Sequence, residues 1–110
     1  MPTKIYLATP YSHPDKNIEL KRFEAVNKKA AELMQRGYIV FSPVSHSHPI
    51  NKFTSIKTDW EFWKRQDFQF IEWADELWVL EVDGWDNSVG VLAEIERAKK
   101  LGMPVIMEAL

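Results

Sequence analysis

Short apolar runs alternate with longer amphipathic stretches along the chain. The apolar runs are rich in β-branched and aromatic residues, which is typical of buried strands. These runs span residues 4–8, 38–41, 76–82 and 104–107. The longer stretches repeat apolar positions with the ~3.6-residue period of a helix. They span residues 16–36, 59–74 and a segment from 87 or 88 to 100. The pattern therefore predicts strands that alternate with helices.

Strands alternating with helices form right-handed βαβ units and a parallel sheet that is covered on both faces. We predict a three-layer α/β domain, flavodoxin-like or Rossmann-like, with a parallel sheet of four or five strands, and assign residues 1–110 to this single domain. In such sheets ligands bind beyond the carboxyl ends of the strands. Those ends are expected at residues 9–13, 42–48 and 83–88.

The composition narrows the class of protein. The 110 residues are 45% hydrophobic and 27% charged, with no cysteine and a formal net charge of -2. These values are typical of a small globular domain, and the lack of thiols excludes a disulfide framework and a zinc–thiolate site. A near-neutral charge gives no reason to expect a nucleic-acid polymer as partner. The apolar runs are far shorter than the ~20 residues of a membrane span, and no signal-peptide segment precedes the first strand, so we expect a cytoplasmic protein.

Two carboxylates interrupt apolar helix faces. In the helix expected at residues 59–74, Asp67 lies in the middle of the stripe formed by Trp60, Trp63 and Ile71. In the following helix, Glu94 lies at the edge of the apolar face, near the carboxyl end of the sheet. Each also has a purely structural interpretation. Asp67 could cap a neighbouring loop, and the Glu94 carboxylate could interact favourably with the positive end of its helix dipole. Together they could also converge on one cleft as a carboxylate pair of the kind that cleaves glycosidic bonds.

Several motifs resemble those of the nucleoside 2-deoxyribosyltransferase superfamily, and most closely its deoxynucleoside 5′-monophosphate N-glycosidase branch. The motifs are D-x-x-x-I-x-x-A-D from residue 67, S-V-G-V-L-A-E from residue 88 with Ala98 beyond it, and I-Y-L-A from residue 5. They cover the beginning and most of the second half of the chain. The segment around residues 42–49 is more similar to uncharacterised small proteins of the same superfamily.

The resemblance implies a role for each matching residue. Glu94 corresponds to the nucleophile that forms a covalent deoxyribosyl ester, and Asp67 to the acid that positions or protonates the base. Tyr6 corresponds to the tyrosine that hydrogen-bonds the nucleophile, and Ser88 to the serine that holds a 5′-phosphate. We add Gly90, from the same motif, to the expected substrate-binding residues. No cofactor and no metal are implied.

The chain also departs from the glycosidase pattern. That branch has an arginine in the first loop, where this chain has Tyr11, Ser12 and His13; we include Ser12 among the substrate-binding residues. Asp86 lies close to the expected phosphate position and would repel an anion unless Lys16 or a histidine compensates. The carboxyl-terminal segment that supplies an amide side chain in the transferases has no counterpart, which favours hydrolysis over transfer.

The stretch at residues 44–57 is polar, contains Pro49, and is expected to be a long loop of the kind that often carries function. Within it, His46 and His48 could bind a metal or contact substrate, although a plain polar loop is the simpler interpretation. In the loop after the third strand, Trp85 could stack on a nucleobase or form a hydrophobic lid.

The remaining aromatic residues bear on packing and assembly. Trp60, Trp63 and Trp78 are expected in the core or in a subunit interface. Phe62 and Trp73 lie off the main stripe, and exposed aromatic surface of this kind usually marks an interface. We therefore expect a homodimer or higher homo-oligomer, as in the family that the chain resembles.

These observations lead to a functional hypothesis, an N-glycosidase that hydrolyses a small nucleoside or its 5′-monophosphate with Glu94 as nucleophile. A non-catalytic nucleotide-binding or regulatory module is the alternative from another class. A third interpretation is a metal-dependent phosphoesterase built on His46, His48 and Asp59.

Overall fold

The computed structural model describes residues 2–54 and 59–110, and within them the chain forms a parallel sheet. Its strands are β1 (Lys4–Ala8), β2 (Ile39–Phe41), β3 (Glu76–Leu80) and β4 (Val105–Glu108), in the spatial order β2-β1-β3-β4. All neighbouring strands run parallel, and Tyr6 of β1 lies opposite Phe41 of β2 and Leu77 of β3. The prediction of an α/β fold with a parallel sheet of four or five strands is confirmed.

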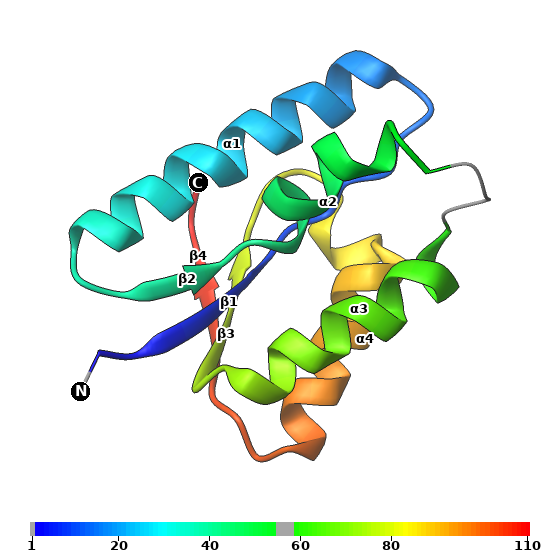
Figure 1. Cartoon of the computed structure of the whole chain (residues 1–110). Helices are drawn as coiled ribbons and strands as arrows, with labels where there is room; N and C mark the ends of the chain where they lie inside the picture. Colours follow the sequence, from blue (N-terminus) through cyan, green and yellow to red (C-terminus); the bar gives the residue numbers. More distant parts are fainter. Residues whose placement is uncertain (1, 55–58) are drawn as a thin grey trace.

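Helices cover both faces of this sheet (Figure 1). Helix α1 (Lys16–Gln35) lies on one face, and α3 (Trp60–Trp73) and α4 (Val89–Lys100) lie on the other. The side chains of β1 alternate between the faces as the strand period requires: Ile5 and Leu7 join the core under α1, and Tyr6 and Ala8 join the core under α3 and α4. As a consequence, the Tyr6 side chain faces the helices that carry the candidate acids.

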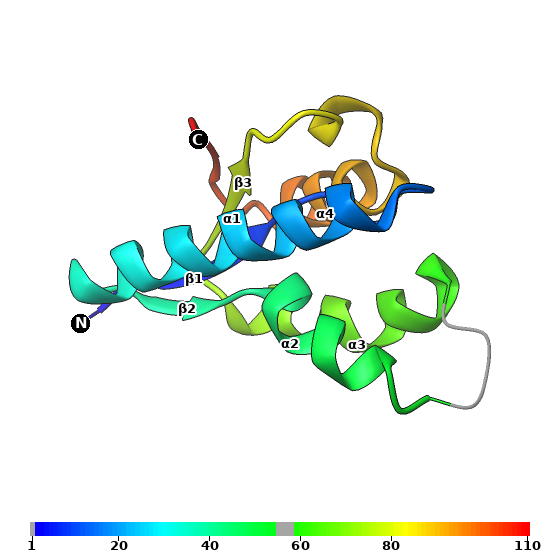
Figure 2. The same ribbon diagram turned by 90° about the horizontal axis from the view of Figure 1, so that it is seen from above.

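The prediction of a loop at residues 44–57 is wrong for its first part, where the chain forms α2 (Pro43–Asn51); residues 55–57 lie outside the described part. Ser42 begins this helix as its N-cap and accepts a hydrogen bond from the Ser45 amide at 3.4 Å, and Pro43 occupies the first turn, where its missing N–H costs nothing. Pro49 falls in the last turn and does not prevent the helix. Helix α2 packs beside α1 at the end of β2, as both ribbon views show (Figure 2).

The order of the strands creates a crevice at one edge of the sheet. The chain leaves β1 through α1 to β2 on one side, and later returns through α3 to β3 on the other side of β1. The connections after β1 and β3 therefore diverge at the carboxyl ends of two neighbouring strands, the place where open parallel sheets bind ligands. The connection after β3 contains the short 3-10 helix η1 (Trp85–Asn87), which leads into α4.

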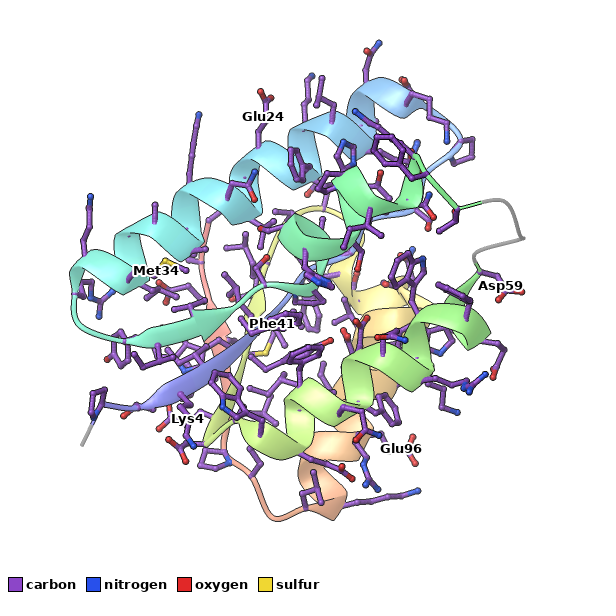
Figure 3. All side chains as sticks on the ribbon, in the orientation of Figure 1. Lys4, Glu24, Met34, Phe41, Asp59 and Glu96 are labelled. Carbon is purple, nitrogen blue, oxygen red and sulfur yellow. The ribbon has the colours of Figure 1, made fainter. Side chains whose placement is uncertain are left out.

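The outer surface carries the charged residues. Figure 3 shows Glu24 and Glu96 pointing outward from α1 and α4, and both are exposed. Trp78 lies in the core, one of the two places expected for it. Phe62 packs edge-on against Trp63, and Trp73 is 38% exposed beneath the Lys4 ammonium. Homo-oligomerisation stays a prediction. Among the described residues, no helix is long and apolar enough to cross a membrane.

The substitution Ser42→Ala tests whether residues 43–51 form a capped helix. We expect it to lower the free energy of unfolding by about 1 kcal/mol, because the side-chain acceptor of the Ser45 amide is lost. Denaturant unfolding measures the change. The matched control is Ser12→Ala at an exposed serine, which should change the free energy by less than about 0.5 kcal/mol. Equal effects of the two substitutions would contradict a capped helix at this position.

Candidate active site

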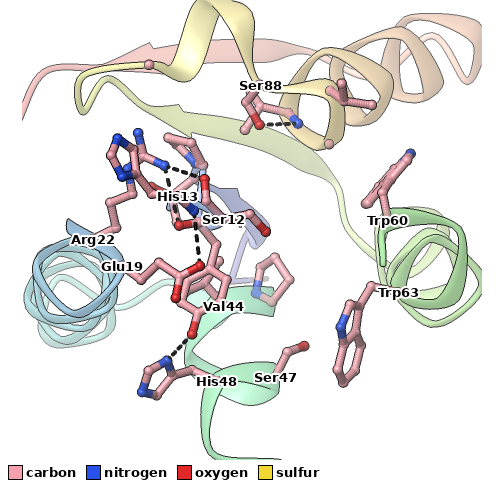
Figure 4. Close-up of a pocket in the computed structure, with 18 of the residues that line it drawn as sticks. Ser12, His13, Glu19, Arg22, Val44, Ser47, His48, Trp60, Trp63 and Ser88 are labelled. Carbon is pink, nitrogen blue, oxygen red and sulfur yellow. Dashed lines mark hydrogen bonds between the residues drawn. The ribbon is translucent and has the colours of Figure 1, made fainter. Parts of the chain in front are cut away.

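A cavity of about 640 Å³ opens at the carboxyl edge of the sheet. Its walls come from the loop after β1, from the first turns of α1, from α2, from the first half of α3 and from the beginning of α4. Figure 4 shows Arg22 and Glu19 on the α1 side, Ser47 and His48 on the α2 side, Trp60 and Trp63 on the α3 side, and Ser88 on the α4 side. Segments that are far apart in sequence thus surround one space, of a size usual for small-molecule sites.

Glu94 lies at the inner end of this cavity. It is 4% exposed, because the face of α4 that carries Val91 and Ala98 packs against the sheet. The Tyr6 hydroxyl, from the central strand, donates a hydrogen bond to the Glu94 carboxylate. Tyr6 is fully buried and does not itself line the cavity. The Tyr6 phenol therefore contacts Glu94 on the side away from the cavity, and the Glu94 carboxylate lies in the cavity wall.

Asp67 approaches the same cavity from α3. It lies one turn from Trp63 and one turn from Ile71 on the helix face that packs toward the sheet, and only 6% of it is exposed. No hydrogen bond or ion pair to the Asp67 side chain is present among the described residues, so the expected alternative, an acid that caps a loop, finds no support in this geometry. The structure brings Asp67 and Glu94 to one cavity.

Burial makes both acids hold their protons tightly. It raises the pKa of Asp67 to about 7. It also raises the pKa of Glu94 to about 8; the Tyr6 hydrogen bond opposes this shift and the nearby charge of Asp67 adds to it. The pKa of Tyr6 is raised well above its ordinary value by burial and by the two acids, so Tyr6 remains a donor. Because two charges in one buried site repel, the acids together retain a proton near neutral pH.

The first turn of α4 forms another wall. Ser88 caps this helix by accepting a hydrogen bond from the Val91 amide at 3.3 Å, and residues 88–90 line the cavity. A helix N-terminus carries partial positive charge and amide donors, which suit an anionic group. The Trp60 indole packs directly over this turn, because a Cβ at Gly90 would lie 3.4 Å from it, an ordinary van der Waals contact.

Arg22 supplies a cation that the sequence did not reveal as a site residue. From α1 it donates to the carbonyls of Tyr11 at 3.3 Å and Ser12 at 3.1 Å, and to the carbonyl of Asp83 at 2.9 Å. Gly84 makes room for it, with a φ of 94° and a position where a Cβ would lie 2.7 Å from the guanidinium. Arg22 thus joins the loops after β1 and β3 and lines the cavity, whereas Asp86 does not.

Two of the expected substrate-binding residues lie elsewhere. His46 is exposed on the outer side of α2, where its ring packs near Phe41 and Phe70, because its helix turns neighbouring residues in different directions. Trp85 packs against the core under α3 and α4, because η1 folds it inward, and it does not line the cavity. Ser12, Ser88 and Gly90 do line it. The positions expected for His46 and Trp85 are therefore corrected.

Trp60 and Trp63 line the cavity, although the helical stripe suggested the core or an interface. They lie on the same face of α3 as Asp67, but in the turns that extend beyond the end of the sheet, so no strand covers them. His48 also lines the cavity; it is stacked on Phe23 with ring centres 4.0 Å apart and hydrogen-bonded to the Tyr11 hydroxyl. The apolar stripe correctly predicted which face of α3 packs toward the sheet. Which residues of that face line the cavity depends on where the sheet ends.

The residues of the metal-dependent interpretation do not come together in the described part of the chain. In residues 2–54 and 59–110, no three histidine, cysteine or acidic side chains are grouped closely enough to hold a metal ion. His48 and Asp59 line the cavity, but His46 points away from it. The proposed set of His46, His48 and Asp59 therefore does not form.

The fold and the cavity define a class of protein. It is a parallel α/β protein with two buried acids in a cavity at the carboxyl edge of its sheet, where the connections after β1 and β3 diverge. A solved structure of 2-deoxyribosyltransferase from the psychrotolerant bacterium Bacillus psychrosaccharolyticus has the same fold, with a TM-score of 0.63 and 27% sequence identity. The similarity covers 96% of this chain and 72% of that chain, and it supports the resemblance to the 2-deoxyribosyltransferase superfamily.

The chain belongs to the family described as "domain of unknown function (DUF1937)", whose model matches residues 3–109. None of the curated proteins compared with the chain matches it.

The raised pKa values make stability depend on pH. A carboxyl with a higher pKa in the folded chain contributes stability that is complete below its unfolded pKa and is lost as the pH rises through its folded pKa, about 8 for Glu94. We therefore expect each acid to lower the free energy of unfolding by roughly 1 kcal/mol per pH unit, Asp67 between about pH 5 and pH 7 and Glu94 between about pH 5 and pH 8. Urea unfolding across this range measures the slope.

The matched variants are Glu94→Gln and Glu96→Gln on the same helix. The first removes a buried titrating group and should flatten the dependence on pH; the second changes an exposed acid paired with Lys100 and should leave the slope unchanged. The same slope in all three proteins would show that Glu94 does not titrate as its burial implies.

Proposed function

We propose that this protein is an N-glycosidase that hydrolyses the bond between the base and the sugar of a nucleoside or its 5′-monophosphate. The observation that carries the proposal is the pair of buried acids, Asp67 and Glu94, in one cavity with a tyrosine behind Glu94. The similarity to a 2-deoxyribosyltransferase agrees with it, since such an enzyme breaks and forms the same kind of bond.

In the first step, the Glu94 carboxylate attacks C1′ of the sugar and forms a glycosyl ester. The bond from C1′ to the base nitrogen breaks, its electron pair goes to the base, and the base takes the proton held by Asp67. The reaction requires the form of the pair in which Glu94 is ionised and Asp67 holds the shared proton, and the Tyr6 hydrogen bond stabilises the negative charge on Glu94 against the effect of burial. Burial of both acids excludes water that would compete with these transfers.

In the second step, water replaces the base at C1′. The water oxygen attacks C1′, the ester bond breaks, and Glu94 leaves as a carboxylate while Asp67, now ionised, accepts a proton from the water. The products are the free base and the sugar, and both acids return to their initial state. Trp60 and Trp63 lie beside Asp67 and offer the apolar surface that an aromatic base requires.

The cavity also favours a phosphorylated substrate. The N-terminus of α4, with Ser88, borders the same space as the Arg22 guanidinium. All the hydrogen bonds from Arg22 to described residues go to uncharged backbone carbonyls, so its positive charge is not neutralised by a carboxylate within them. Arg22 thus supplies the cavity with a guanidinium, although the first loop has no arginine. These features suit a 5′-phosphate.

The proposed reaction predicts release of base. Incubation with nucleosides and their 5′-monophosphates, in ribo and deoxy forms, should release free base that chromatography detects. Glu94→Ala should reduce the rate by several orders of magnitude, because the nucleophile is lost, and Asp67→Asn by about 10²–10⁴-fold, because the proton donor is lost. Mass spectrometry of Asp67→Asn after mixing with substrate should show a glycosyl group on Glu94.

The exposed acid Glu96 provides the control, and Glu96→Gln should retain full activity. No base from any substrate, or unchanged release by Glu94→Ala, would overturn the proposed reaction. Ligand-dependent stabilisation without product would instead identify a nucleotide-binding module.

Recognition of a phosphate by Arg22 predicts a selective defect. For a 5′-monophosphate, we expect Arg22→Met to raise KM by about tenfold, since one charge-assisted contact is lost. For the corresponding free nucleoside, KM should change little. The ratio of the two effects separates phosphate binding from the structural role of Arg22 in joining two loops, because a disordered loop would impair both substrates alike.

A further inference from the structure

Two buried hydroxyl groups in the cavity wall have no hydrogen-bond partner. Thr9, just after β1, is 5% exposed, and Ser47, on α2, is partly buried; both line the cavity. Among the described residues, Thr9 Oγ1 and Ser47 Oγ are two of three buried side-chain polar atoms without a partner; the other is Nε of Arg97, which does not line this cavity. Buried hydroxyls are almost always satisfied, so two exceptions in one cavity require an explanation.

Both positions are set by the packing of α2 against β1. Val44 of α2 belongs to the core that includes Ile5 and Leu7 of β1, and Ser47 follows it by one helical turn on the same face. Figure 4 shows the Ser47 hydroxyl pointing from α2 toward the space in front of Trp63. Thr9 lies at the end of β1, the strand that also carries Tyr6. The two hydroxyls therefore belong to the wall formed by β1 and α2, whereas Asp67 and Glu94 belong to α3 and α4.

The chain does not use the local bonds that usually satisfy such groups. A serine in a helix commonly donates to the carbonyl four residues earlier, but Ser47 makes no such bond to Pro43. The neighbouring hydroxyls behave differently: Ser45 bonds to Asn27 and to Ser42, and Thr54 donates to the Asn51 carbonyl at 2.9 Å. Among the described residues, the buried hydroxyls without a partner are thus those of Thr9 and Ser47, and both residues line the cavity.

We propose that Thr9 and Ser47 form a hydrogen-bonding subsite for a polar edge of the ligand, on the wall that faces the two acids. The ligand group is a sugar hydroxyl or the heteroatom edge of a base. A rotation about the Cα–Cβ bond turns either hydroxyl toward the ligand, and each can donate or accept. Naming the ligand a nucleoside or nucleotide rests on the proposed function; the unsatisfied hydroxyls do not.

The proposal predicts opposite effects on stability and on binding. Thr9→Val and Ser47→Ala remove a buried hydroxyl without a partner, so each should raise the melting temperature of the free protein, by about 2–5 °C. Each should also weaken ligand binding by about tenfold, because a hydrogen bond in the complex is lost. A hydroxyl with a purely structural role would not combine these two signs.

Binding is measured by calorimetry in the Glu94→Gln background, which cannot turn over, with the ribo and 2′-deoxy 5′-monophosphates and with a purine nucleotide that lacks an exocyclic group. Loss of ribo-versus-deoxy discrimination in Thr9→Val or Ser47→Ala identifies a sugar contact. Loss of discrimination against the unsubstituted purine identifies a base contact. Either result supports the subsite.

The controls carry the same substitutions at Ser45 and Thr54, whose hydroxyls have partners and which do not themselves line the cavity. Ser45→Ala and Thr54→Val should lower the melting temperature and leave binding unchanged. Unchanged binding in both Thr9→Val and Ser47→Ala overturns the subsite, as does the failure of every nucleotide to bind. Absence of base release by the wild-type protein, with binding that Thr9→Val weakens, would overturn the proposed reaction and leave the subsite standing.

Discussion

The arrangement of the cavity depends on the buried hydrogen bond from Tyr6 to Glu94. It joins the central strand to α4 across 88 positions of sequence, and both partners are almost completely removed from solvent. A carboxylate buried at this depth without a donor would cost several kcal/mol. The phenol satisfies one oxygen and holds the carboxyl in place, so the packing of α4 on the sheet also fixes the geometry of the acid.

Because of the strand order of the sheet, a polar cavity can form beside this contact while both faces of the sheet keep their apolar cores. The connections after β1 and β3 diverge to opposite faces, which leaves space between their ends without removing apolar contacts from either core. Arg22 and Gly84 then join the two loops across this space. Helices α3 and α4 thus position the acids, and backbone carbonyls hold the Arg22 guanidinium in the wall of the same cavity.

The sequence predicted the alternation of strands and helices because each element has its own hydrophobic period. It failed for α2, where Pro49 and the polar composition outweighed the capping signal of Ser42 and Pro43. It also misplaced His46 and Trp85, since a loop was assumed in both places and short helices turn these side chains outward and inward, respectively. Arg22 gave no signal, because an arginine in the first turns of a helix is usually a solvated surface residue.

By itself, then, the sequence determined the fold class and showed that Asp67 and Glu94 lie on helix faces where acids do not belong. Both conclusions follow from periodicity, which is a property of neighbouring residues. Only the tertiary structure decided that the two acids share a cavity with Tyr6 behind Glu94, that Trp60 and Trp63 form its wall, and that Thr9 and Ser47 lack partners. These facts depend on distances between elements, which follow from how the helices pack on the sheet and not from the pattern within any one element.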